Sequence, residues 1–175
     1  MESVLAQTYT DIEYIIVDGV STDGSVEVIR EYENQLHITH STIHLLWSSE
    51  PDNGIYDAMN RGIQRATGDY IQILNSGDLL AAPDVTERMM AALDKTSNIQ
   101  HSTLENGFFP AIFYGNMLKS YDGKTIISRD TCGGDMYTPE SFLYFYKGTL
   151  NHDCAYIRRD LFEKYGLYNE DMKIC

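Results

Sequence analysis

The sequence has few basic residues, few cysteines and no long apolar run, and each shortage excludes a class of protein. Its 175 residues include 13 lysines and arginines against 26 aspartates and glutamates, a formal net charge of −13. Such a charge opposes binding to nucleic-acid phosphates and to an anionic membrane surface. The three cysteines are odd in number and widely spaced, which fits neither a disulfide framework nor a zinc site. We therefore expect no nucleic-acid partner and a reducing, cytoplasmic environment.

Two membrane signals are also absent from the sequence. No apolar stretch reaches the roughly 18 residues that a transmembrane helix needs. Residues 1–5 have neither the basic region nor the long apolar region of a signal peptide. The sequence thus predicts neither a membrane span nor a cleaved leader within these residues.

Apolar runs of strand length alternate along the chain with stretches of helical periodicity. The chain is 43% hydrophobic, enough to bury the core of one domain over residues 1–175. Asp122-Gly123, between two further apolar stretches, predicts a β-hairpin. The alternation is typical of an α/β fold whose mostly parallel sheet is flanked by helices. We predict strands at Ile12–Val17, Ile43–Trp47 and Tyr70–Leu74, and helices near residues 24–34, 55–66 and 83–94.

Small and polar residues follow two of these predicted strands. Asp18 ends the first, and Asn75-Ser76-Gly77-Asp78 ends the third. In open α/β sheets, ligands bind beyond the carboxyl ends of the strands, and a carboxylate there can hold a cation. The alternative is an ordinary polar turn. Helix caps are expected at Ser21 or Thr22 and at Asp52 or Asn53. Asp57 and Arg61 are expected in solvent or behind the site.

Three blocks in this order, Glu13–Ser25, Glu50–Gly62 and Ala66–Leu80, resemble the family 2 glycosyltransferases, which have the GT-A fold. The resemblance covers essentially the whole chain. It implies an inverting, metal-dependent hexosyltransferase-type enzyme of polysaccharide or cell-surface glycan synthesis. Its partners would be a nucleotide sugar, UDP-linked, and a glycan or lipid-linked acceptor. It also implies a nucleotide-binding half over residues 1–95 and an incomplete acceptor-side half over 96–175.

The resemblance assigns roles to individual residues. Asp78 would contact the divalent cation, Mn²⁺ or Mg²⁺, which neutralises the leaving diphosphate. Asp18 would accept hydrogen bonds from the uracil or ribose. Two positions depart from the family pattern: Gly19 stands where a second Asp is usual, leaving Asp18 as the only acid at that strand end, and the acidic metal motif begins with Asn75. The substrate-binding residues predicted in this way are Asp18, Ser21, Asp52, Gly54, Asn75 and His152.

Two family features fall outside the sequence. The opening strand, central in the GT-A sheet, would precede Met1, and the exposed strand edges would then favour self-association. The general base would lie beyond Cys175, because Gly166–Glu170 resembles the segment before it. Glu170 and Asp171 are the nearby alternatives for the base.

Two other functions stay open on the sequence. One is a catalytically incomplete fragment that binds nucleotide weakly. The other is a sugar nucleotidyltransferase, although no Gly-rich phosphate loop with a basic residue is visible near the N-terminus. The domain is expected in the cytoplasm, with peripheral attachment to the inner face of the membrane as an alternative for the full-length protein.

Overall fold

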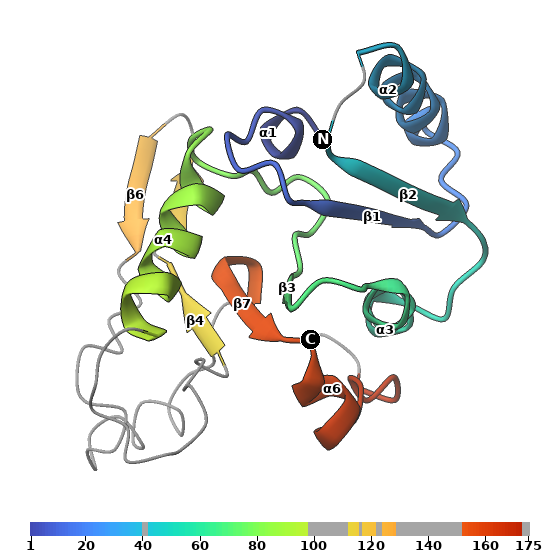
Figure 1. Ribbon diagram of the computed structural model, residues 1–175. Helices are drawn as coiled ribbons and strands as arrows, with labels where there is room; N and C mark the ends of the chain where they lie inside the picture. The colour runs from blue at the N-terminus through green and yellow to red at the C-terminus, as the bar shows by residue number, and fades with distance from the viewer. Residues whose placement is uncertain (40–41, 98–111, 116, 122–123, 129–151, 173–175) are drawn as a thin grey trace.

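The computed structural model describes residues 1–39, 42–97, 112–115, 117–121, 124–128 and 152–172 (Figure 1). These residues form an α/β arrangement, as predicted. None of the described helices is both long enough and apolar enough to cross a membrane.

The first part of the fold is a parallel strand pair with helices beside it. Strand β1 (Glu13–Asp18) pairs in parallel with β2 (His44–Ser49), and α2 (Ser25–Thr39) connects them. In Figure 1 this pair lies between α2 and α3 (Ile55–Arg65). The register sets Asp18 opposite Ser49, so the polar ends of both strands lie at one edge.

Helix α3 packs closely against β1 through its small and apolar residues. Met59 and Ile63 are buried, and a Cβ added at Gly62 would lie 3.8 Å from the Val17 side chain. Asp57 is also buried, which excludes a position in solvent and leaves the other expected place, behind the site. Because α3 begins directly after the loop that follows β2, its packing fixes where that loop lies.

The second part of the fold is an antiparallel sheet of order β3-β7-β4. It is formed by β3 (Tyr70–Gln72), β7 (Ala155–Arg158) and β4 (Ile112–Tyr114). Phe113 contacts both Tyr70 and Tyr156, with ring centroids 5.0 Å apart in each pair. In the described part of the chain, β1 has one strand neighbour, β2, and β3 has one, β7.

The remaining described elements are a hairpin, a 3-10 turn and further helices. The predicted hairpin is confirmed, since β5 (Met117–Tyr121) pairs antiparallel with β6 (Lys124–Ser128). Helix α4 (Val85–Ser97) follows β3 along the chain. A 3-10 turn, η1 (His152–Cys154), precedes β7, and α6 (Asp160–Tyr165) follows it.

The N-terminal residues hold the loop between β3 and α4 in place. Helix α1 (Glu2–Leu5) is followed by Gln7, a buried side chain. The Gln7 amide donates to the Ala82 carbonyl at 2.8 Å and accepts from the Thr86 N–H at 3.0 Å. The Thr8 N–H donates to the Pro83 carbonyl at 2.8 Å. These bonds fix the chain a few residues after Asp78.

Candidate functional site

Asp18 is a buried carboxylate at the carboxyl end of β1. It is 7% exposed and accepts hydrogen bonds from the Ser49 hydroxyl at 2.6 Å and the Ser21 N–H at 3.1 Å. Hydrogen bonds from Ser21, and then from Ser49, hold its pKa below the ordinary value for an aspartate. Asp18 is therefore ionised at neutral pH and held in one orientation at this strand end.

A second carboxylate lies against Gly19, the residue that follows Asp18, although the sequence suggested only one. Asp52 reaches across from the loop before α3, and a Cβ added at Gly19 would meet its Oδ2 atom at 2.5 Å. Its Oδ1 atom accepts from the Gly54 N–H at 2.9 Å. The expectation that Asp18 is the only acid at this strand end is therefore wrong, because Gly19 leaves the space that the Asp52 carboxylate fills.

Replacing Gly19 by Ala is expected to destabilise this part of the site. The backbone of Gly19 is not in the left-handed region, so the cost comes from the collision with Asp52 and not from strain. The atoms that the methyl group would meet all belong to the end of the Asp52 side chain, which can rotate away, so the cost should be below the about 1–3 kcal/mol of overpacking a core. Urea unfolding of Gly19→Ala, alone and with Asp52→Ala, measures the coupling. An equal cost of Gly19→Ala with and without Asp52 would contradict this contact.

The turn after Asp18 contains a strained residue. Val20 has a φ of 66° and is exposed. β-Branched residues rarely adopt this left-handed conformation, which costs on the order of 1–3 kcal/mol, and such strain tends to gather at functional sites. The strain adjoins the two carboxylates, which supports a functional role for this turn.

A partly buried ion pair fixes the start of α3. Arg61 binds Asp57 through two hydrogen bonds, Nε to Oδ1 at 2.9 Å and Nη2 to Oδ2 at 2.8 Å. Asp57 also accepts from the Asn53 N–H at 2.8 Å. That bond, followed by those from Arg61, lowers the pKa of Asp57. The helix is capped at Gly54 and not at the predicted Asp52 or Asn53. This network secures the loop that carries Asp52.

A second group of polar residues follows β3. The Asn75 amide donates to the Asp153 carboxylate at 2.6 Å, and the Gln72 amide donates to the Asp153 carbonyl at 2.9 Å. The Asp78 N–H donates to the Asn75 carbonyl at 3.1 Å, and Asp78 is exposed. Sequence reasoning missed Asp153, although it directly follows His152. His152 itself lies in η1.

These residues fit a cation that the substrate helps to hold. Within the ranges that the structure describes, no three histidines, cysteines, aspartates or glutamates are grouped as a metal cage. Mg²⁺ and similar ions, however, often use one or two carboxylates together with substrate phosphates. Asp78, exposed at the end of β3, can supply a carboxylate of this kind.

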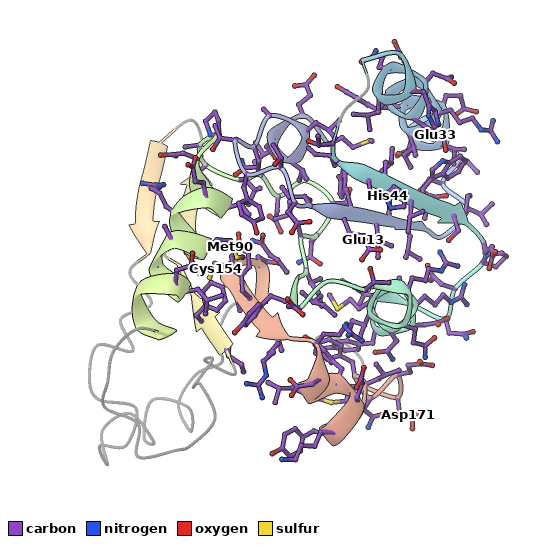
Figure 2. The ribbon with its side chains drawn as sticks, viewed as in Figure 1. Glu13, Glu33, His44, Met90, Cys154 and Asp171 are labelled. Atoms are coloured by element: carbon purple, nitrogen blue, oxygen red, sulfur yellow. The ribbon has the colours of Figure 1, made fainter. Side chains whose placement is uncertain are left out.

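The two alternatives for the base have hydrogen-bond partners outside these groups. The Glu170 carboxylate accepts from the Asn60 amide at 2.9 Å. Asp171 is exposed, its N–H donates to the Asn169 side chain at 3.0 Å, and it lies beyond α6 (Figure 2). The structure thus joins the predicted residues into two groups, one of Asp18, Ser21, Asp52 and Gly54, the other of Asn75 and Asp78 with Asp153.

Known proteins with similar folds and sequences are glycosyltransferases. The chain is 17% identical to residues 1–349 of Staphylococcus aureus TarS, solved in complex with UDP, with a TM-score of 0.66 over 98% of this chain and 46% of that one. This likeness shows a shared fold, that of GT-A glycosyltransferases.

Curated relatives match by sequence. An uncharacterized glycosyltransferase of Mycobacterium tuberculosis is 40% identical over 94 residues, which are 53% of this chain and 33% of that protein. A PGL/p-HBAD biosynthesis glycosyltransferase of Mycobacterium bovis is 27% identical over 97% of this chain and 56% of its own length. The chain therefore spans between about a third and just over half of these relatives.

The family comparison agrees with the three sequence blocks and the fold. The model of glycosyl transferase family 2 matches residues 1–166. This match covers both groups of polar residues and nearly all of the chain. The chain belongs to glycosyl transferase family 2.

Proposed function

We propose that this chain binds a UDP-sugar and belongs to an enzyme that transfers the sugar, with inversion, to a glycan or lipid-linked acceptor. The observation that carries the proposal is the Asp18 carboxylate at the end of β1, with the Asp52 carboxylate against the next residue, Gly19, in a member of this family. Such carboxylates can accept hydrogen bonds from the ribose hydroxyls and from the uracil N–H. TarS, which shares the fold, was solved with UDP, and this supports a uridine nucleotide as the ligand.

The residues divide between the two ends of the donor. Asp18 and Asp52 accept hydrogen bonds from the nucleoside, with Ser21 and Gly54 holding them in place. Asp78 and Asn75 face the diphosphate, where Asp78 contacts Mn²⁺ or Mg²⁺. When bound, the cation neutralises the charge of the leaving nucleoside diphosphate. His152 completes the acceptor or diphosphate side.

The general base of the reaction is a residue other than Glu170 in this proposal. The Glu170 carboxylate is already hydrogen-bonded to Asn60, which lowers its availability to take a proton from an acceptor hydroxyl. Glu170 and Asp171 then belong to the segment that leads to the base. We place the enzyme at the cytoplasmic side of the membrane, with the acceptor in polysaccharide or cell-surface glycan synthesis.

Calorimetric titration of the 175-residue chain tests the donor half of the proposal. UDP is expected to bind in the presence of Mn²⁺, and more weakly after the metal is chelated. ADP under the same conditions is the control, and it should bind less tightly because the base differs. Equal binding of UDP and ADP, or none of UDP with Mn²⁺, would contradict a UDP-sugar site.

Sugar transfer by the chain tests the second half. A panel of UDP-sugars is offered with glycan and lipid-linked acceptors, beside a longer chain that extends it in both directions. UDP binding with transfer only by the longer chain would favour the alternative of a catalytically incomplete fragment. Equal transfer by both chains would make Glu170 or Asp171 the base.

Size-exclusion chromatography at several concentrations tests the self-association proposed for the edges of β1 and β3.

A further inference from the structure

Asn60, in the middle of α3, forms hydrogen bonds through both its amide nitrogen and its amide oxygen. It is 3% exposed. Its Oδ1 atom accepts from the Tyr168 N–H, and its Nδ2 atom donates both to the Tyr168 carbonyl and to the Glu170 carboxylate, each at 2.9 Å. An asparagine amide has two N–H groups and one oxygen. All of them are therefore directed at the segment that follows α6.

The same face of α3 holds this segment by a ring contact. The Tyr56 and Tyr168 rings are stacked, with centroids 5.6 Å apart and 24° between their planes. Tyr56 precedes Asn60 by four residues, so the two side chains are neighbours on the helix surface. Phe162 of α6 contacts Tyr168 from a third direction, with ring centroids 6.0 Å apart. The position and orientation of the Tyr168 backbone are thus fixed by α3.

Polar side chains of helix α3 bind two separate segments of the chain. Asp57 in its first turn, paired with Arg61, accepts from the Asn53 N–H in the loop that carries Asp52. Its next turn holds Tyr168 and Glu170 through Asn60. Burying an amide is costly unless it is hydrogen-bonded, and an apolar residue would fill the space without this cost. What the amide adds is a fixed position for the segment.

We propose that Asn60 is a positioning residue that sets the place of the Tyr168–Glu170 segment against α3. The inference rests on the proposed function, in which this segment leads to the acceptor-side base. Glu170 acts in it as a hydrogen-bond acceptor of Asn60, and the pair orders the segment for sugar transfer. Binding of UDP, which uses Asp18 and Asp52, does not depend on the pair.

Asn60→Asp is the variant that tests the proposal, because it keeps the size of the side chain. The new carboxylate can still accept from the Tyr168 N–H, but it cannot donate to the Tyr168 carbonyl, and it meets the Glu170 carboxylate as a like charge. Hydrogen exchange at residues 166–171 is expected to be at least about tenfold faster, the effect of losing one hydrogen bond to a charged group. The affinity for UDP should change by less than about threefold, since a hydrogen bond to a charged group at the nucleoside would account for more than that.

A second substitution distinguishes positioning by this pair from a general loss of packing. Glu170→Gln in the Asn60→Asp background removes the repulsion and offers an N–H to the carboxylate introduced at position 60. It should therefore restore part of the slow exchange, and part of any sugar transfer that Asn60→Asp removed, since the Tyr168 carbonyl still lacks its donor. Gln64→Ala, an exposed change on the same helix, is the matched control and should alter neither.

Each outcome decides the inference separately from the proposed function. Fast exchange in Asn60→Asp that Glu170→Gln partly reverses, with UDP affinity kept, supports it. Unchanged exchange in Asn60→Asp, or no recovery in the double variant, overturns it. Failure of the unaltered chain to bind UDP would contradict the proposed function, while the exchange rates would still decide whether the pair orders the segment.

Discussion

Replacing Asp18 by Ala is expected to weaken UDP binding by about 1.5–3 kcal/mol, the value of a hydrogen bond to a charged group. This corresponds to roughly a tenfold to more than hundredfold rise in Kd. Asp18 is ionised and held by Ser49 and Ser21, so the nucleoside meets an acceptor that needs no reorganisation. Because the contact is with the nucleoside, the loss should be the same with Mn²⁺ and after chelation. Calorimetry under both conditions measures it.

The control for Asp18 is another aspartate of the same loop. Asp23 is exposed and accepts from the Ser25 N–H at 3.1 Å, so Asp23→Ala removes an equal charge without touching the strand end. It should leave UDP affinity nearly unchanged. Circular dichroism of both variants checks that the fold is kept. An Asp18 effect that disappears once the metal is removed would assign Asp18 to the metal and contradict its role at the nucleoside.

Local patterns in the sequence predicted most of the first half of the fold. The apolar run at Ile12–Val17 became β1 with a shift of one residue, and the stripe over residues 55–66 became α3. The first signal is an apolar run and the second a helical period, and both are strong enough to survive packing. The strand predicted at Tyr70–Leu74 ends at Gln72, and the helix predicted to end near residue 94 continues to Ser97. Element ends depend on neighbours that periodicity does not describe.

The sequence was enough to predict the site residues that follow each strand, but not the contacts that join residues from different strand ends. Asp18 directly follows an apolar run and Asp78 lies in the polar turn after another, so position along the chain was enough to find them. The approach of Asp52 to Gly19 and the bond from Asn75 to Asp153 join residues far apart in sequence. No local pattern encodes such contacts. A glycine where the family usually has Asp was the one available signal, since it leaves space for another side chain.

The burial of two polar residues of α3 was also not predictable from a local pattern. Asp57 and Asn60 occupy positions that a helical pattern assigns to the polar face, yet both are buried. Each is satisfied by a partner, Arg61 for Asp57 and the Tyr168 backbone for Asn60. A pattern of apolar and polar residues predicts which positions are buried and which face solvent. A buried polar residue that is paired with a partner gives the same sequence signal as a polar residue in solvent.

Replacing Asp78 by Asn is expected to abolish the Mn²⁺-dependent part of UDP binding while leaving the fold intact. The amide keeps the shape of the side chain but loses the charge that attracts a divalent cation. Asp78 is exposed in the turn after β3, and exposed substitutions usually change stability by less than about 0.5 kcal/mol. The UDP affinity that remains should equal that of the unaltered chain after chelation. Titrations with and without Mn²⁺, together with urea unfolding, test both halves of the prediction.

Asp69 offers the matched control for Asp78, because it is an exposed aspartate at the opposite end of the same strand. Asp69→Asn changes the net charge by the same amount, so it separates a local effect at the carboxyl end of β3 from a general loss of negative charge. It should leave the Mn²⁺ dependence of UDP binding intact. If Asp78→Asn binds UDP as tightly as the unaltered chain when Mn²⁺ is present, Asp78 does not contact the metal. The carboxylate of Asp153, which lies against Asn75, would then be the next to replace.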